Sequence, residues 1–202
     1  MMQRKKTLLI GSGGHAVSLL ENFYDNIAGY LDFQPTRNLN IEWVGSDEKA
    51  PFFANEGYDF HIAVIYSKSP DMRLRRAIIE KYGEFEAAFK TFISSSALVS
   101  RGSEVGEGCA IMAGAILNKA TLSRHVVANS GSVIEHDVEI GENVFIGPGA
   151  VIGGGTKIGK DCFIGLGAKV RNGINISDNV TVGMGSIVTK DILKPGLYYG
   201  II

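Results

Sequence analysis

The second half of the chain carries a repeat with a period of six residues. An apolar residue recurs at the first position of each hexad, and a small or β-branched residue usually stands at the fifth. The first positions are Ile93, Val99, Val105, Ile111, Leu117, Leu122, Ala128, Ile134, Ile140, Ile146, Ile152, Ile158, Ile164, Val170, Ile176, Val182 and Val188. A six-residue period held over about 100 residues is typical of a parallel β-helix, in which each hexad supplies one short strand and one turn. Because a sandwich of ordinary strands has no reason to keep this period, we expect a triangular β-helix with the first positions inside.

Glycine and cysteine agree with this plan. Residues 93–202 hold 19 of the 26 glycines, which suit the tight turns between hexads. The step from Leu117 to Leu122 is five residues long, so one turn should be shortened. Cys109 and Cys162 both stand at fifth positions, nine hexads apart. We therefore expect two buried thiols that are too far apart for a disulfide.

Residues 1–92 follow a different plan. Apolar runs at 7–10, 27–31, 41–45 and 59–66 predict strands, and the stretches 16–24 and 72–82 predict helices. Strands that alternate with helices favour a small parallel sheet. The expected fold class is therefore a small Rossmann-like α/β domain over 1–92, followed by an all-β parallel β-helix over 93–202.

Composition excludes several classes of protein. Lys plus Arg is 20 and Asp plus Glu is 21, a net charge of -1, so nothing favours a nucleic-acid partner or an anionic membrane surface. No apolar run approaches the roughly 20 residues that a membrane span needs. The basic start resembles a signal peptide, but Gly11 interrupts the apolar run that follows it. We expect a cytoplasmic protein.

A glycine-rich turn follows the first predicted strand. Residues 11–16 read Gly-Ser-Gly-Gly-His-Ala, and Asp32 stands 21 residues after Gly11. This spacing matches a dinucleotide-binding turn, in which backbone amides approach phosphate and a carboxylate accepts hydrogen bonds from a sugar hydroxyl. Since some 90 residues are too few for a complete NAD domain, we favour a site for a sugar nucleotide or sugar phosphate. A tight turn without a ligand remains the alternative.

The triplet Glu135-His136-Asp137 lies inside the repeat. Ile134 should point inward, which places His136 on the outer surface near a corner of the β-helix. An exposed imidazole beside a carboxylate can act as a general base; a solvated polar turn is the alternative. His61 reads as structural, and the role of His125 stays open. His125 and His136 are the two histidines of the repeat, and no third ligand stands at a recognisable spacing, so we expect no metal site.

Together these segments resemble one known family. The resemblance rests on the following segments: the Gly-x-Gly-Gly-His turn at 11–15, the strand end 29–32, the stretch 129–137 (Asn-Ser-Gly-Ser-Val-Ile-Glu-His-Asp), and the later hexads at 182–186 and 188–191. The chain resembles the hexapeptide-repeat acetyltransferases that modify sialic acid or nucleotide-linked amino sugars: sialic acid O-acetyltransferases and UDP- or GDP-amino-sugar N-acetyltransferases. The resemblance implies a left-handed β-helix, a homotrimer, and acetyl-CoA bound in the groove between neighbouring subunits.

The resemblance also implies roles for residues. It assigns acceptor contacts to Gly13, Gly14, His15 and Asp32, the general base to His136 and support of its basicity to Asp137, and the CoA groove to Leu166, Met184 and Phe145. Phe145 stands where the family often has a histidine that hydrogen-bonds acetyl-CoA. The implied reaction is direct attack of an amine or hydroxyl of a sugar, a nucleotide-linked amino sugar or sialic acid on the thioester.

Two features leave other functions open. Phe145 and Phe163 should lie on the outer faces, so we expect a neighbouring subunit to cover them. Phe145 also makes the groove more apolar, which suits a longer acyl-CoA. The non-enzymatic alternative is a trimeric scaffold that binds sugar nucleotides without catalysis. It is suggested by Phe145 in place of the histidine and by the absence of the family's C-terminal motif after Gly200.

Overall fold

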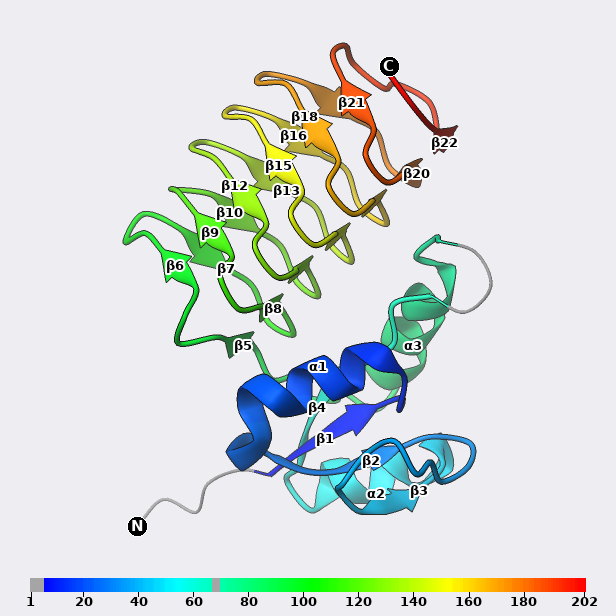
Figure 1. Ribbon diagram of the computed structural model, residues 1–202. Coiled ribbons are helices and arrows are strands. Elements are labelled where there is room, and N and C mark those ends of the chain that lie inside the picture. Colours follow the sequence, from blue (N-terminus) through cyan, green and yellow to red (C-terminus); the bar gives the residue numbers. More distant parts are fainter. Residues whose placement is uncertain (1–5, 67–69) are drawn as a thin grey trace.

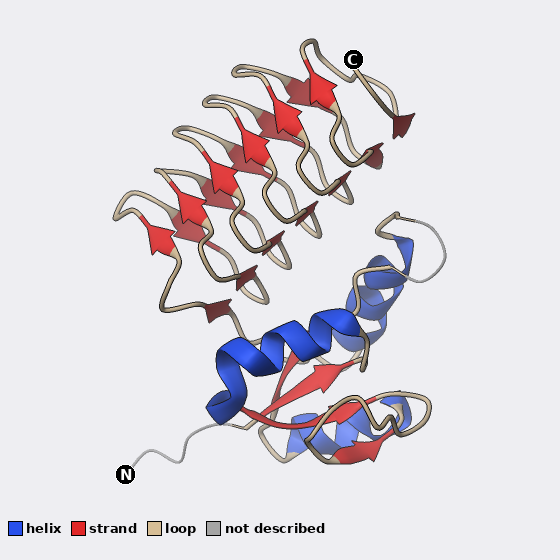
Figure 2. Cartoon of the chain, viewed as in Figure 1, coloured by secondary structure: helices blue, strands red, loops and turns tan. Residues whose placement is uncertain are grey.

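The computed structural model of the chain describes residues 6–66 and 70–202. It consists of an N-terminal α/β region that packs against one face of a long parallel β-helix (Figure 1). Figure 2 shows that the helices are confined to the α/β region, while the coils of the β-helix contain short strands joined by turns. Within the described residues, no helix is both long and apolar enough to cross a bilayer.

The α/β region is a four-stranded parallel sheet in the order β3-β2-β1-β4. Its elements are β1 (Thr7–Ile10), α1 (Gly14–Phe23), β2 (Ile27–Leu31), β3 (Trp43–Gly45), α2 (Ala50–Asn55), β4 (Asp59–Ile62) and α3 (Arg73–Gly83), with single 3-10 turns at Tyr24–Asn26 and Asp47–Lys49. The strand expected over 59–66 is shorter, since it ends at Ile62. Helix α2 was not expected because six residues are too few to display an apolar period.

The β-helix presents three parallel sheets. The seven-stranded sheet contains β5 (Phe92–Ile93), β8 (Ala110–Ile111), β11 (Val127–Ala128), β14 (Phe145–Ile146), β17 (Phe163–Ile164), β20 (Val180–Val182) and β22 (Gly196–Tyr198). The six-stranded sheet contains β6 (Leu98–Val99), β9 (Ile116–Leu117), β12 (Val133–Ile134), β15 (Val151–Ile152), β18 (Lys169–Val170) and β21 (Ile187–Val188). The five-stranded sheet contains β7 (Glu104–Val105), β10 (Thr121–Leu122), β13 (Glu139–Ile140), β16 (Lys157–Ile158) and β19 (Asn175–Ile176).

The hexad pattern sets the register of the coils. Val133 pairs with Val151, one coil and 18 residues later, whereas Ile116 pairs with Val133 across only 17 residues because of the shortened turn. First-position and fifth-position side chains together form a single buried core that runs along the β-helix. Cys109 and Cys162 belong to that core as free thiols, as expected. Ile93 departs from the pattern, since it is 47% exposed on the outermost strand of its sheet.

The outer side of the seven-stranded sheet is covered by the chain's own α/β region. Phe145 is 6% exposed and Phe163 is 8% exposed. Their rings stack at a centroid distance of 4.8 Å within a cluster that includes Leu19 and Phe23 of α1. The expectation that Phe145 and Phe163 need a neighbouring subunit to cover them is therefore wrong, because burial against the same chain already removes them from water.

Arg75 of α3 joins the two parts of the chain. Its side chain is fully buried and donates to the carbonyl oxygens of Ile62 and Val64, at 3.2 and 2.8 Å, and to that of His125 in the β-helix at 3.0 Å. Its Nε donates to Oδ1 of Asn143 at 3.0 Å. Burial lowers the pKa of Arg75 to about 10. Because removal of one partner from such a buried charged network costs several kcal/mol, this cluster fixes the position of the sheet against the β-helix.

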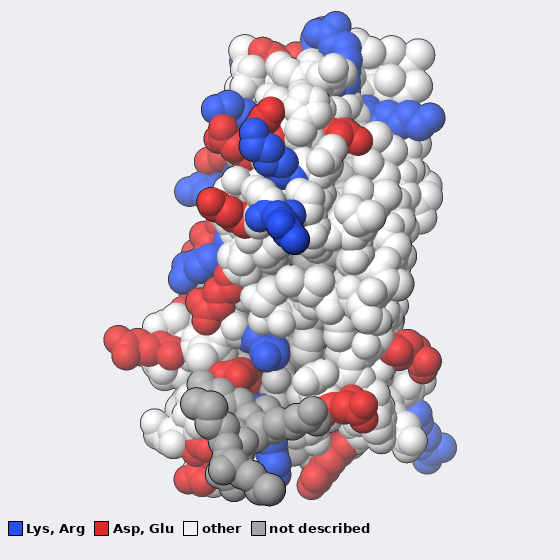
Figure 3. Space-filling model, turned by 90° about the vertical axis from the view of Figure 1, so that its left-hand side faces the viewer, with Lys and Arg blue, Asp and Glu red and all other residues white. Residues whose placement is uncertain are grey.

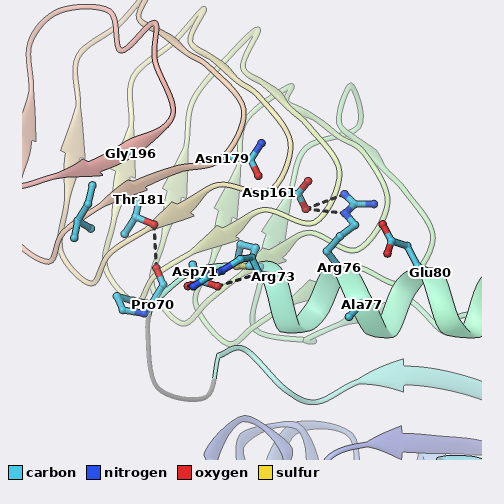
Figure 4. Close-up of a pocket in the computed structure, with 12 residues that line it drawn as sticks. Pro70, Asp71, Arg73, Arg76, Ala77, Glu80, Asp161, Asn179, Thr181 and Gly196 are labelled. Atoms are coloured by element: carbon cyan, nitrogen blue, oxygen red, sulfur yellow. Dashed lines mark hydrogen bonds and ion pairs between the residues drawn. The ribbon is translucent and has the colours of Figure 1, made fainter.

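The same helix makes ion pairs at the edge of the contact. Arg76 lies 2.9 Å from Asp161 and 3.2 Å from Glu142, both on turns that enter the seven-stranded sheet. Thr181 adds a hydrogen bond of 3.0 Å to the carbonyl oxygen of Pro70. Figure 4 shows Arg76, Asp161, Thr181 and Pro70 among the residues that line a hollow of about 420 Å³ between α3 and the last coils. Its charged groups are largely paired with one another. We therefore interpret the hollow as a gap left by imperfect packing between the α/β region and the β-helix.

Two buried histidines predict that the fold is sensitive to acid. Desolvation lowers the pKa of His61 to about 3 and that of His125 to about 4. In the unfolded chain both histidines become protonated near pH 6.5, whereas in the folded chain they stay neutral to a lower pH. Below pH 6.5 the unfolded chain therefore binds more protons than the folded chain does. The free energy of unfolding should therefore fall with pH from about 6.5 downward, by about 1.4 kcal/mol per pH unit for each histidine.

Urea unfolding at a series of pH values measures this slope. His125 has a φ of 61° and packs edge-on against Phe89, so His125→Asn is a suitable variant because asparagine tolerates the left-handed region. The variant should lose stability overall and show a flatter dependence on pH between 6.5 and 4.5. An unchanged slope in this variant would contradict the assignment to His125.

Candidate functional site

A small cavity lies where β1 and β4 end. It measures about 270 Å³ and is lined by Gly13, Gly14, His15 and residues 63–66. Gly11 permits the close approach of these two segments, since it has a φ of 97° and a Cβ there would lie 2.3 Å from Cγ2 of Val64. Helix α1 begins in this cavity with Gly13 as its N-cap and without a side-chain cap. The first amides of a helix of this kind attract an anion such as a phosphate.

His15 contributes a neutral imidazole to the same cavity. The side chain is half-buried, and its Nε2 atom is buried without a hydrogen-bond partner within the described part of the chain. Desolvation, with smaller contributions from His61 and Arg75, lowers the pKa of His15 well below its ordinary value. A buried polar nitrogen that lacks a partner is costly, so this atom is available to a ligand that enters the cavity.

Asp32 lies at the same edge of the sheet. It directly follows β2, which pairs with β1. Its Oδ2 accepts a hydrogen bond of 2.5 Å from the hydroxyl of Ser12, and its Oδ1 accepts one of 2.7 Å from the amide of Phe33. The structure therefore brings together the glycine turn, His15 and Asp32, which the sequence had placed in one acceptor site.

His136 stands on the turn between β12 and β13. Its side chain is 62% exposed, as the sequence predicted for a corner position, and Nδ1 lies 3.0 Å from Oδ2 of Asp137. Asp137 also pairs with Nζ of Lys119 at 3.0 Å. Hydrogen bonds from His136 and then from Lys119 lower the pKa of Asp137, which keeps it ionised beside the imidazole.

Gly154 makes room for this imidazole in the next coil. A Cβ at position 154 would lie 2.6 Å from Nε2 and 2.7 Å from Cε1 of His136. The ring therefore packs against the backbone of Gly154, and a side chain at position 154 would collide with Nε2. The sequence shows three successive glycines at 153–155 but does not reveal this contact, which depends on the stacking of the turns.

Leu166 and Met184 occupy a different corner. They stand on the turns that lead from the seven-stranded to the six-stranded sheet, and they are 57% and 78% exposed. Tyr66, which lines the small cavity, packs edge-on against Phe163, three residues before Leu166. Phe145 does not join them, since its ring is buried under the α/β region. Phe145 therefore does not line an open groove, contrary to the expectation from the sequence.

The remaining candidates are buried. Burial raises the pKa of Cys109 to about 11 and that of Cys162 to about 12, so neither is a ready nucleophile. His61 and His125 are 0% and 1% exposed. Among residues 6–66 and 70–202, no group of three His, Cys, Asp or Glu side chains is placed to hold a metal ion.

The small cavity and His136 lie apart from each other within one chain. The acceptor cavity lies beside the seven-stranded sheet, whereas His136 projects from the corner between the six-stranded and five-stranded sheets. The two therefore lie on different sides of the β-helix.

Comparisons with known proteins bear on the same regions. Residues 119–154 match the family described as bacterial transferase hexapeptide (six repeats), and residues 155–190 match the hexapeptide repeat of succinyl-transferase. The chain is similar to PerB from Caulobacter crescentus, solved in complex with CoA and GDP-perosamine. The identity is 30% and the TM-score is 0.88, over 96% of this chain and 94% of that one.

Two further structures share the fold. The acetyltransferase domain of PglB from Neisseria gonorrhoeae, in complex with acetyl coenzyme A, matches with 27% identity and a TM-score of 0.85 over 98% of this chain and 97% of that one. WeeI from Acinetobacter baumannii matches with 21% identity and a TM-score of 0.78 over 93% of each chain. The fold class expected from the sequence, a small α/β domain before a left-handed parallel β-helix, is confirmed.

The differences in exposure predict selective chemical modification. His136 is open to solvent, whereas His61 and His125 are buried and the Nε2 atom of His15 is enclosed. Diethyl pyrocarbonate should therefore modify one of the four histidines rapidly, and His136→Ala should remove this fast phase. The fast phase is followed by the absorbance of the modified histidine. His125→Asn is the control, and it should keep the fast phase. Several equally fast histidines would contradict the observed burial.

Proposed function

The chain belongs to the hexapeptide-repeat sugar acetyltransferases, and we propose that it transfers an acetyl group from acetyl-CoA to the amine of a nucleotide-linked amino sugar. It is an acyltransferase by membership of this family. The observation that carries the specific proposal is the 30% identity over nearly the whole chain to a protein solved with CoA and GDP-perosamine. The exposed His136–Asp137 pair and the cavity at the glycine turn supply the two groups that such a reaction needs.

The acceptor is held by the α/β region. The phosphates of the nucleotide lie at the first amides of α1, at Gly13 and Gly14, and Nε2 of His15 donates or accepts a hydrogen bond inside the cavity. Asp32 accepts hydrogen bonds from a hydroxyl of the acceptor at the neighbouring strand end. A sialic acid would not use the phosphate site, so the cavity favours a nucleotide-linked amino sugar over it.

His136 acts as the general base. Asp137 accepts the hydrogen of Nδ1, which leaves the lone pair of Nε2 free to take a proton. The acceptor nitrogen attacks the thioester carbonyl carbon, Nε2 removes the proton from the nitrogen, and the carbon–sulfur bond breaks to release CoA as the thiolate, which receives that proton. A backbone amide of the neighbouring β-helix stabilises the oxyanion. Both cysteines are buried, so neither is available to carry the acetyl group, and the acetyl group passes directly to the acceptor.

The six-stranded sheet supplies the contact between copies. Its outward residues are mostly aliphatic: Leu98, Ile116, Val133, Val151 and Ile187, with Lys169 between the last two. Leu98 is 59% exposed and Ile187 is 43% exposed. Figure 3 shows a broad uncharged face beside an edge that carries mixed charges. We assign this face to a homotrimer, because an extended aliphatic surface of this kind is normally covered in a protein assembly.

Trimerisation through this face would complete the active site. The His136 turn borders one side of the six-stranded sheet, and the turns of Leu166 and Met184 border the other. When neighbouring copies meet at these sheets, His136 of one copy faces Leu166 and Met184 of the next, beside the acceptor cavity of that copy. The pantetheine arm of acetyl-CoA then lies between the two β-helices.

The other functions considered have less support. The case for a longer acyl-CoA rested on an apolar groove at Phe145, and that ring is buried inside the chain. A non-catalytic scaffold would have no use for an exposed His136 that is paired with a carboxylate and lies over Gly154.

Replacement of His136 tests the proposed chemistry. His136→Ala should lower kcat by about 100- to 10,000-fold, because general-base catalysis contributes about this much. The affinity for CoA, measured by calorimetry, should change less than twofold. Turnover is followed by thiol release from acetyl-CoA with a panel of UDP- and GDP-linked amino sugars and sialic acid. Unchanged turnover in His136→Ala, or release with no amino sugar of the panel, would refute the proposal.

Substitution on the six-stranded sheet tests the assembly. Ile116→Glu places a charge on this face and should shift a trimer to monomers in sedimentation, with at least a tenfold loss of turnover. Thr121→Glu is the matched control, since Thr121 lies outward in the same coil but on the five-stranded sheet. A monomeric wild-type chain, or an Ile116→Glu variant that stays trimeric, would contradict the assignment of this face.

A further inference from the structure

Arg75 is a buried cation whose hydrogen bonds all go to neutral groups. Its side chain is fully buried, and its acceptors are the carbonyl oxygens of Ile62, Val64 and His125 and the side-chain oxygen of Asn143. In the part of the chain that the structure describes, no carboxylate bonds to it directly. The guanidinium stays charged near neutral pH, because burial lowers its pKa only to about 10. A buried charge without a counter-ion is costly, and exceptions of this kind concentrate at functional sites.

The next residue of α3 shows the usual arrangement of charges. Arg76 is partly exposed and pairs with Asp161 at 2.9 Å and with Glu142 at 3.2 Å (Figure 4). Asn143 stands between the two arginines, since its Oδ1 accepts a hydrogen bond from Arg75 and its Nδ2 donates one of 2.7 Å to Asp161. The carboxylate of Asp161 therefore compensates Arg76, and a neutral amide separates it from Arg75.

The charge of Arg75 lies one peptide group behind the wall of the small cavity at the glycine turn. Val64, whose carbonyl oxygen is 2.8 Å from Nη1, lines that cavity together with Ile65. In a trans peptide the carbonyl and the amide hydrogen point in opposite directions, so the amide of Ile65 points away from the guanidinium. The guanidinium and this peptide dipole therefore both make the electrostatic potential along the cavity wall more positive.

The lining of the cavity adds little positive charge of its own. Within the described chain it consists of Gly13, Gly14, His15 and residues 63–66, none of which is Lys or Arg. The imidazole of His15 is neutral, because burial, and then the charges of His61 and Arg75, hold its pKa well below its ordinary value. The first amides of α1 contribute only partial charges. Arg75 is therefore the full positive charge that the described residues bring to this cavity.

We propose that Arg75 is a specificity-determining residue of the acceptor site, and that its buried charge selects a nucleoside diphosphate group over ligands that carry less negative charge. This assignment rests on the proposed function, in which the phosphates of a nucleotide-linked amino sugar lie at the first amides of α1. Arg75 does not touch the ligand. Its charge acts across the cavity wall through a medium of low dielectric constant, where the attraction between charges is several-fold stronger than in water.

An exchange of two side chains tests this assignment while Arg75 stays in place. Asn143→Asp/Asp161→Asn moves the carboxylate next to Nε of Arg75, conserves the net charge and the shapes of both side chains, and reverses the hydrogen bond between them. Both positions have a positive φ, 56° and 57°, which asparagine and aspartate tolerate. Asp161→Asn alone is the matched control, because it takes the same carboxylate from Arg76 and still leaves Arg75 without a counter-ion.

Calorimetry on the whole chain measures the Kd for two series of probes: UDP, UMP and uridine, and GDP, GMP and guanosine. In Asn143→Asp/Asp161→Asn the Kd of the diphosphate should rise about tenfold or more, that of the monophosphate by a smaller factor, and that of the nucleoside by less than about twofold, since the lost attraction scales with ligand charge. Asp161→Asn should keep the wild-type preference for the diphosphate.

A second pair of variants at position 75 separates charge from packing. Arg75→Lys and Arg75→Gln both lose the planar guanidinium with its set of hydrogen bonds, but only Arg75→Lys keeps a positive charge. The ratio of nucleoside Kd to diphosphate Kd should stay near the wild-type value in Arg75→Lys and fall about tenfold or more in Arg75→Gln. Equal ratios in the two variants would overturn the assignment.

The outcomes separate this assignment from the proposed function. An unchanged diphosphate Kd in Asn143→Asp/Asp161→Asn would overturn the role of Arg75. An equal loss for all three members of a series would do the same, because it indicates a structural effect, and so would an equal loss in Asp161→Asn. In each case thiol release by the wild type with a nucleotide-linked amino sugar leaves the acetyltransferase proposal standing. A wild type that binds neither diphosphate would also overturn the role of Arg75, whereas a wild type without thiol release on any such sugar would refute the proposed function.

Discussion

The in-register stacking of the coils controls the rest of this structure. Each strand pairs with its equivalent one coil away, so a side chain that points outward in one coil lies above and below equivalent side chains in its neighbours. Three columns of different chemistry result: aromatic and apolar on the seven-stranded sheet, aliphatic on the six-stranded sheet, and polar on the five-stranded sheet. Local choices in each hexad therefore add up to whole faces of distinct chemistry, and the α/β region covers the apolar face of the seven-stranded sheet.

Arg75 determines which face the α/β region covers. Its guanidinium reaches the carbonyl oxygens at the end of β4 and the turn of His125, and the phenylalanine pair completes the contact. Since residues 63–66 also line the acceptor cavity, the same cluster sets the position of that cavity relative to the β-helix. The contact that Arg75 makes therefore positions the candidate acceptor site, although Arg75 touches no ligand in the proposed mechanism.

The candidate site residues lie on two sides of the β-helix, and this separation is the reason for proposing an assembly. Within one chain, His136 and the small cavity at the glycine turn are separated by the width of the β-helix. The aliphatic six-stranded sheet lies between the turn of His136 and the turns of Leu166 and Met184, so the proposed contact between copies at this sheet would bring His136 of one copy toward the cavity of the next. In the proposed assembly, the acyl-transfer site forms only where two copies meet, so activity would depend on oligomerisation.

Much of this could be predicted from the sequence, and the limits have a physical cause. The hexad period located the interior of the β-helix, the buried cysteines and the exposed corner of His136, because those features depend on residues close together in the chain. The glycine turn and Asp32 were also placed correctly at one sheet edge, since parallel strands end on the same side. No local pattern could tell which element would pack on which face. Tertiary structure alone decided four features: the burial of Phe145, the contacts of Arg75, the packing of His136 against Gly154, and the separation of His136 from the small cavity. Each of them depends on contacts between segments that are far apart in the sequence.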